Sequence, residues 1–459
     1  MTSVRFLSGL ALIALCSAAL QAQSPGFKNL RFDEDWSPLA EGVETNHLFP
    51  VIKWIDLEDG WALSTGGMLR WRGVREVGRS LMPASPRVND FNLLRTRVHA
   101  ELRHEDGFRA FVELIDARIY SESRAPLGID RNHSDVLNAF VEFREGDTTL
   151  RAGRFGMQKG SQRYISPLEW SNTRRRFEGV LVRQDFEGGN ADFFVTHPVN
   201  TDAQHTDHDN DSLWFSGAYL TFPDEGGGTD AYLLALNETT ASLTSGSGRR
   251  GPMDLYTAGA RRWGKDGQFD YETELALQFG QFAGDQIEAQ SFTARAGWSE
   301  PDLPGAPRFG FDLDWASGDS DPTDSRHETF NQLFPLGHAY LGKLDLVGRQ
   351  NIVDLQPDVT FTLDERTKLK FEQHFFRLED RRDALYNAGG APSLVDATGG
   401  AGTQVGRELD VVLSHALESL APHAHILLGY SRFSPGDYVK TLGSQRHVDL
   451  VYTQLTFTF

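Results

Sequence analysis

Alternation of apolar and polar residues with a period of two constrains this chain more than any other feature of its sequence. From 94 to 102 every second residue is apolar or threonine, and three arginines, a histidine and a glutamate lie between and beside them. The run 269–279 alternates in the same way. This pattern suits strands that have one face in water and the other in an apolar phase, and it does not suit an amphipathic helix. Similar runs recur along the chain, so we predict an all-β protein.

The connections between the predicted strands alternate between short and long. Short turns are predicted at positions such as 104–108 and 264–267, and long polar segments at 157–176, 280–288 and 318–351. About eight short and nine long connections imply about 18 strands, with 16 as the alternative because strand boundaries drawn from one sequence can shift by a few residues. Outer-membrane barrels have an even strand number, short periplasmic turns and long outer loops. We therefore predict a transmembrane antiparallel β-barrel.

Overall polarity does not argue against this fold. The chain has 459 residues, a formal net charge of −19 and a mean hydropathy of −0.40. Only one face of a barrel strand meets lipid, so a spanning barrel can be as polar as a soluble protein. A soluble sandwich or propeller is the structural rival, but the internal repeat of a propeller is absent.

The first residues have the pattern of an export signal. Arg5 precedes an apolar run from 6 to 20, and small residues follow it. The single cysteine, Cys16, lies in this run, so we expect an exported chain without disulfides. The predicted order is a signal peptide at 1–22, an acidic periplasmic lead-in at 23–60 and a bacterial outer-membrane barrel at 61–459.

Basic residues are concentrated early in the chain. Residues 70–183 hold 20 Arg and 1 Lys against 15 acidic residues, whereas 184–459 hold 20 basic and 41 acidic residues. Arg95, Arg97 and Arg103 share the polar face of one predicted strand, and a ring of arginines makes a pore prefer anions. The alternative is that such charges only stabilise the barrel wall through ion pairs with acids.

Further arginines extend this pattern. The next predicted strand places Arg109 and Glu113 on one face. Arg151 and Arg154 have opposite parity, so both face the lumen only if the strand has a bulge near Gly153. Otherwise one of them lies at an interface. Arg163 lies in the long connection 157–176, which we expect either outside the barrel or folded into the pore.

Catalytic and metal-binding motifs are scarce. Motifs of nucleotide-binding sites, zinc proteases and serine hydrolases are absent, although a hydrolase whose site assembles only in space remains an alternative. Asp207, Asp209 and Asp211 could bind Ca²⁺ in an outer loop, but the run lacks the glycine and glutamate of an EF-hand. A solvated acidic loop is the competing interpretation, and we expect no other cofactor. A weaker candidate is the acidic run 319–324.

Two stretches of the sequence resemble the alginate export family of outer-membrane β-barrels. The first contains LLRTRVHAEL at 93–102, FVELIDARI at 111–119, LRAGRFG at 150–156, QRYISPLEWSN at 162–172 and FEGV at 177–180, and the second contains FNQLFPLGHAYLG at 330–342. The resemblance implies an 18-stranded barrel with an arginine-lined constriction. It implies pore-lining roles for Arg95, Arg97, Arg151, Arg154 and Arg163, with Glu113 and Asp116 as acidic partners.

The predicted function is passive, anion-selective passage of an anionic polysaccharide such as a polyuronate, or of a sugar acid. The main alternative is a general or solute-specific porin for small nutrients, and an outer-membrane hydrolase is a third. The acidic later part of the chain would repel a polyanion unless its acids lie in outer loops and turns. We expect a monomer that contacts outer-membrane lipid and a periplasmic export partner, and that binds no nucleic acid.

Overall fold

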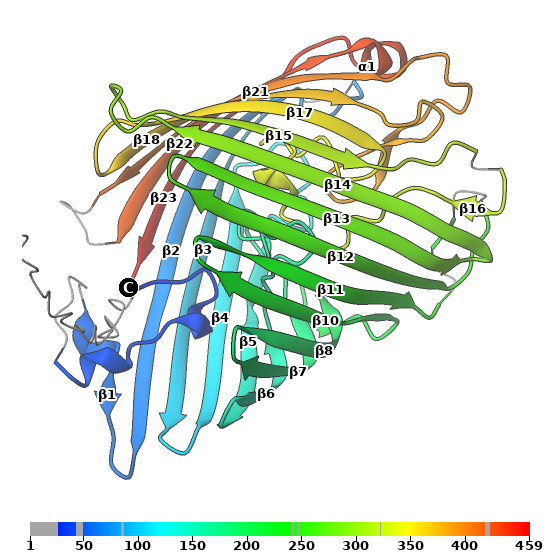
Figure 1. The fold of residues 1–459 in the computed structure, drawn as a ribbon. Helices are drawn as coiled ribbons and strands as arrows, with labels where there is room; N and C mark the ends of the chain where they lie inside the picture. Colours follow the sequence, from blue (N-terminus) through cyan, green and yellow to red (C-terminus); the bar gives the residue numbers. More distant parts are fainter. Residues whose placement is uncertain are drawn as a thin grey trace, which may run out of the picture.

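The computed structural model describes residues 26–42, 49–83, 87–240, 243–245, 248–321, 323–417 and 423–459. The predicted signal peptide, 1–22, lies outside them. Eighteen long antiparallel strands pair in chain order, and the last of them pairs with the first, which closes a barrel (Figure 1). Both the predicted fold and the predicted strand number are confirmed. The strands are β2 (Trp61–Val77), β3 (Val88–His104), β4 (Phe108–Tyr120), β5 (Asn132–Glu145), β6 (Thr148–Phe155), β7 (Phe177–Phe186), β8 (Gly189–Asn200), β10 (Leu213–Asp224), β11 (Gly227–Glu238), β12 (Met253–Asp266), β13 (Phe269–Phe282), β14 (Asp285–Ser299), β15 (Arg308–Ala316), β17 (Ile352–Thr362), β18 (Thr367–Arg377), β21 (Gln404–Ala416), β22 (Ala424–Pro435) and β23 (Val448–Thr458).

The closing pair, β2 and β23, stays in register from Met68 opposite Thr458 to Val77 opposite Asp449. Closure leaves no unpaired strand edge, and an open edge in hydrocarbon costs several kcal/mol for each unsatisfied backbone group. The C-terminus lies close to β1 (Ile55–Asp56), at the end of the barrel where the short turns lie (Figure 1). In outer-membrane barrels the short turns lie at the periplasmic end.

One predicted connection is much shorter in the structure. The segment 280–288 was predicted as a long loop, but β13 and β14 continue through it and leave only Ala283 and Gly284 as a turn. Both residues have positive φ, of 51° and 90°, as a tight hairpin turn requires. The polar residues of this segment belong to strands that extend further than the periodicity indicated, so the strand count is unaffected.

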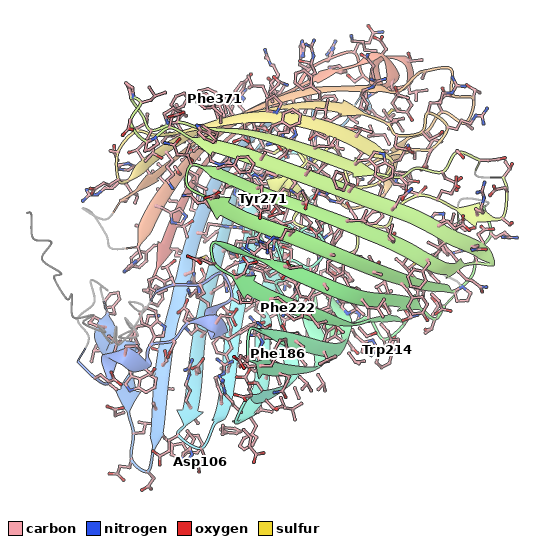
Figure 2. The ribbon with its side chains drawn as sticks, viewed as in Figure 1. Asp106, Phe186, Trp214, Phe222, Tyr271 and Phe371 are labelled. Atoms are coloured by element: carbon pink, nitrogen blue, oxygen red, sulfur yellow. The ribbon has the colours of Figure 1, made fainter. Side chains whose placement is uncertain are left out.

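The outward face of the barrel is apolar and rich in aromatic residues. Phe186 and Phe222, near the turn end, and Trp214, near the loop end, point away from the barrel (Figure 2). All three are exposed, as expected for side chains that meet lipid or its interface. Among the described residues no helix is long and apolar enough to cross a membrane.

The lumen contains the buried core of the molecule. Two long connections, 156–176 and 317–351, fold into it and pair with each other through a parallel bridge between Ile165 and Phe334. The backbone N–H of Ser166 donates to the carbonyl of Phe334 at 2.9 Å, and that of Phe334 donates to Tyr164 at 3.0 Å. We call these connections the first inward loop (156–176) and the second inward loop (317–351).

Short elements complete the structure. The segment from 26 to 42 enters the turn end of the barrel, where Phe32 makes edge contacts with Phe111 and Phe140. The remaining elements are the 3-10 helices η1 (Arg31–Asp33), η2 (Ser37–Leu39), η3 (Pro50–Ile52) and η4 (Gly337–Ala339), the helix α1 (Asp437–Leu442), and the short strands β9 (His208–Asp209), β16 (Arg326–His327), β19 (Leu385–Tyr386) and β20 (Pro392–Leu394).

Candidate functional site

A wall of arginines covers the lumen face of β2 and β3. The alternation predicted for β3 places Arg95 and Arg97 inward, and Arg70 and Arg72 alternate in the same way on β2. Arg70 and Arg95 are direct cross-strand partners. Like charges opposite each other destabilise a sheet, so this pair needs an anion nearby.

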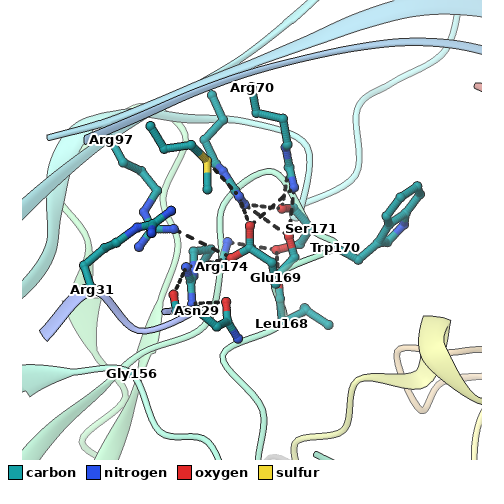
Figure 3. A network of polar contacts seen from close by, with 12 residues as sticks. Asn29, Arg31, Arg70, Arg97, Gly156, Leu168, Glu169, Trp170, Ser171 and Arg174 are labelled. Atoms are coloured by element: carbon teal, nitrogen blue, oxygen red, sulfur yellow. Dashed lines mark hydrogen bonds and ion pairs between the residues drawn. The ribbon is translucent and has the colours of Figure 1, made fainter. Parts of the chain in front are cut away.

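Glu169 of the first inward loop supplies that anion. Its carboxylate is paired with Arg95, lies 2.6 Å from the Arg174 guanidinium, and lies 3.7 and 3.8 Å from Arg97 and Arg70 (Figure 3). Burial alone would raise the pKa of Glu169, but the surrounding guanidiniums, led by those of Arg174 and Arg95, hold it well below its usual range. We call Arg70, Arg95, Arg97 and Arg174 the arginine cluster.

Glu113, an acidic partner expected from the resemblance, also contacts this cluster. Its carboxylate lies 2.7 Å from a guanidinium nitrogen of Arg97, and it accepts a hydrogen bond from the Asn138 amide at 2.6 Å. Four guanidiniums therefore face two carboxylates, which leaves the region positively charged.

Trp170, the residue after Glu169, separates two cavities. The Arg72 guanidinium lies 3.4 Å from the centre of its ring, and the His338 ring stacks on it at 3.6 Å. A cavity of about 570 Å³ and another of about 400 Å³ share these three side chains in their walls. Arg79 and Lys343 also line the larger cavity, whereas Arg31 and Glu169 line the smaller one.

Arg103, Arg109 and Arg151 form a second group near the turn end. Arg109 and Arg151 each lie 2.7 Å from a carboxylate oxygen of Glu142. Arg109 donates to the Phe32 carbonyl at 2.6 Å, and Arg103 donates to that of residue 34 at 2.9 Å. These arginines thus hold the N-terminal segment 26–42 inside the mouth of the barrel.

Two residues expected in the pore lie on the outward face instead. Strand β6 keeps a continuous register with β7, so Arg154 points to the opposite face of the strand from Arg151. The Arg154 guanidinium pairs with Glu178 at 2.5 Å. No bulge forms at Gly153, and the Arg154 guanidinium also donates to the backbone carbonyls of Val136 and Asp207 at 3.1 and 3.0 Å. Asp116 also lies on the outward face of its strand and pairs with Arg118 at 2.6 Å, because its parity is opposite to that of Glu113.

Arg163 points across the lumen to an acidic wall. It donates to both carboxylate oxygens of Asp314 on β15, at 3.0 and 3.1 Å, and to Glu272 on β13 at 3.3 Å. Arg349 of the second inward loop pairs with Asp314 as well. Asp314 and Glu272 are thus acids of the later chain that lie in strands and face the lumen, where they anchor the inward loops.

The three aspartates considered for calcium, Asp207, Asp209 and Asp211, are not grouped together in the structure. Asp207 is paired with Arg176 and accepts a hydrogen bond from Asn132 at 2.6 Å. Asp209 lies in β9, and Asp211 lies in the connection that follows. Across the part of the chain that the structure describes, no three His, Cys, Asp or Glu side chains are grouped to hold a metal ion. The calcium hypothesis therefore has no structural support.

Several residues of the site were not singled out by sequence reasoning. Arg70 and Arg72 flank an outward-facing tryptophan in the same alternation that identified Arg95 and Arg97, so this signal was available. Glu169 and Trp170 lie within the QRYISPLEWSN motif, but no local pattern predicts which barrel wall a loop residue will meet.

Comparison with known proteins agrees with the geometry. The family model described as "Alginate export" matches residues 61–452, which is most of the chain. The chain belongs to the alginate export family. A search of curated proteins found no match.

Solved structures show the same fold at low sequence identity. Pseudomonas aeruginosa OccD3 (OpdP) has a TM-score of 0.57 at 12% identity, covering 89% of this chain and 93% of that one. The outer membrane protein OpdK of the same organism has a TM-score of 0.56 at 14% identity, covering 86% and 98%, and Acinetobacter baumannii OccAB2 has 0.57 at 9%, with the same coverage. The family and fold are those of channel proteins of the outer membrane, and the chain is an outer-membrane pore.

Proposed function

We propose that this pore carries small anionic saccharides, namely sugar acids and short uronate chains, across the outer membrane without a chemical step. The observation that supports this most is the arginine cluster, in which four buried guanidiniums face only Glu169 and Glu113. Guanidinium groups bind carboxylates through paired, charge-assisted hydrogen bonds. A cationic region inside a low-dielectric barrel attracts anions and repels cations.

The acidic wall is compatible with anion passage because loop cations neutralise it. Arg163 and Arg349 pair with Asp314, and Lys343 of the second inward loop lies 3.1 Å from Glu372 on β18. Asp314 and Glu372 are not among the residues that line the two cavities beside Trp170. The later chain contributes Asp345 and Asp449 to the larger cavity, where Lys343, Arg72 and Arg79 supply positive charge.

The size of the cavities favours small solutes. Volumes of about 570 and 400 Å³ fall within the roughly 300–1,000 Å³ of small-molecule sites. The inward loops occupy much of the remaining lumen. A sugar acid or the leading unit of a uronate chain fits such a space better than a wide, hydrated polymer.

Flux into proteoliposomes tests the proposal. We expect the purified pore to admit D-glucuronate faster than D-glucose, which has nearly the same size without the charge. Arg97→Gln should lower the glucuronate-to-glucose ratio about fivefold, because it removes one buried charge-assisted contact. Arg154→Gln removes the same charge as Arg97→Gln, but from the outward face of the barrel, and should leave the glucuronate-to-glucose ratio unchanged. Equal rates for the two sugars in the unmodified pore would favour the general porin instead.

A further inference from the structure

Glu169 covers the arginine cluster from the side of the cavity. Its side chain is 32% exposed, whereas that of Arg97 is 1% exposed, and the other three guanidiniums are buried as completely. Among the described residues, the Nε atoms of Arg70 and Arg95 and the Nη1 atom of Arg97 have no hydrogen-bond partner. The cluster thus has spare donors beside Glu169, and its member Arg70 lines the smaller cavity together with Glu169.

The segment that carries Glu169 is held by two of the same arginines and by Asn172, whose side-chain amide donates to the carbonyls of Leu94, Arg118 and Asp130. Arg70 donates to the carbonyl of Glu169 at 2.8 Å and to that of Ser171 at 2.8 Å, and Arg95 donates to the same two carbonyls at 3.2 and 3.0 Å. The residues at the two ends of the segment, Leu168 and Arg174, have φ of 53° and 64°. Such left-handed backbone is strained for residues other than glycine and persists only where surrounding contacts enforce it.

Glu169 also has the chemistry of the solute. A side-chain carboxylate on a loop and the carboxylate of a uronate present the same two oxygens to a guanidinium. The arginine cluster therefore cannot distinguish them by charge or by hydrogen-bond geometry. Because Glu169 is tethered, it has a high effective concentration at the cluster, and a free carboxylate must compete with it.

We propose that Glu169 is the built-in occupant of a carboxylate-binding site formed by Arg70, Arg95, Arg97 and Arg174, and that the carboxylate of a passing sugar acid takes its place. This inference rests on the proposed function and identifies the position at which the solute binds. The exchange replaces one carboxylate by another, so the cluster has the same number of carboxylate partners before and after it.

The exchange also links binding to passage. Trp170 follows Glu169 directly, and the Arg72 guanidinium donates to its carbonyl at 3.0 Å while stacking on its ring. Glu169 and Trp170 lie on the same short segment, so movement of Glu169 away from the cluster also shifts Trp170 from its place between Arg72 and His338. Solute binding thus loosens the side chain that separates the two cavities.

Block of single-channel current by D-glucuronate tests this site. Removing the competitor with Glu169→Gln should lower the half-blocking concentration about tenfold, because the solute then meets free donors. Asp116→Asn removes one negative charge from the outward face and should leave that concentration as in the unmodified pore. An unchanged or higher half-blocking concentration in Glu169→Gln would overturn the inference, and so would an equal decrease in Asp116→Asn.

A second variant keeps the test decisive if Glu169→Gln does not assemble into a folded barrel. Glu169→Asp keeps the charge but withdraws the carboxylate by one methylene, so it should lower the half-blocking concentration by a smaller factor, about threefold. No decrease in that variant would contradict the site. Loss of anion preference in the unmodified pore is a different result, because it would defeat the proposed function itself.

Discussion

At the residue scale, the arginine cluster and its two carboxylates come from strands β2, β3 and β4 and from the first inward loop, which carries both Glu169 and Arg174. Arg95 and Arg97 are fixed by the pleat of β3, and Arg70 is fixed by the pleat of β2. Glu169 reaches the same place only because the first inward loop enters the lumen. Its ionisation is therefore coupled to the folded state.

This coupling predicts a pH-dependent contribution to stability. Folding lowers the pKa of Glu169 from its ordinary value of 4.5, so its carboxylate stabilises the fold fully above about pH 4.5 and progressively less as the pH falls towards the folded pKa. The unmodified protein should unfold at a higher temperature than Glu169→Gln at pH 7, and this difference should shrink at pH 3. Thermal unfolding in detergent measures both values. A difference that stays constant or grows on acidification would contradict the assigned ion pairs.

Sequence reasoning reached these residues unevenly. Alternation in 93–103 was enough to place Arg95, Arg97 and Arg103 on one face, because the pleat is a local property. Alternation could not show whether Arg151, Arg154 or both face the lumen, because the answer depended on whether β6 has a bulge. The continuous pairing of β6 with β7 excludes that bulge. Asp116 was assigned by resemblance alone, although its parity already opposed that of Glu113.

At the element scale, the inward loops are held by ion pairs with the far wall. Arg163 on the first inward loop contacts Asp314 and Glu272, and its guanidinium lies 4.0 Å from the ring centre of Tyr340 on the second. These contacts join residues more than 100 positions apart, so no local pattern could predict them. The short turn at 283–284 was missed for a related reason, because polar residues occur in strands as well as in loops.

Arg163→Ala tests this anchoring. The change removes the contacts of the first inward loop with Asp314 and Glu272, which keep Arg349 and Arg261 as partners, so it should destabilise the fold by about 1.5–3 kcal/mol and release the inward loops. Thermal unfolding and single-channel recording should then show a less stable pore with larger, noisier current. Arg326→Ala removes exposed ion pairs to Asp324 and Glu328, so it should change stability far less and leave the current unchanged. Equal effects of the two variants would mean that Arg163 does not anchor the loops.

At the scale of the whole molecule, the barrel divides its lumen into a basic wall on β2 and β3 and an acidic wall that holds the inward loops. The strand number and closure followed from local alternation and loop lengths, both of which a sequence displays. The separation of the basic and acidic walls could not be predicted in this way. The net charge of −19 does not report where the acids lie or which cations neutralise them.

The reversal potential of the unmodified pore in a potassium chloride gradient across a planar bilayer tests this account most directly. If the arginine cluster makes the pore anion-selective, the reversal potential will have the sign of the chloride equilibrium potential. D-glucuronate added to one chamber will then reduce the current. A potential on the potassium side, with current unaffected by glucuronate, would contradict the account.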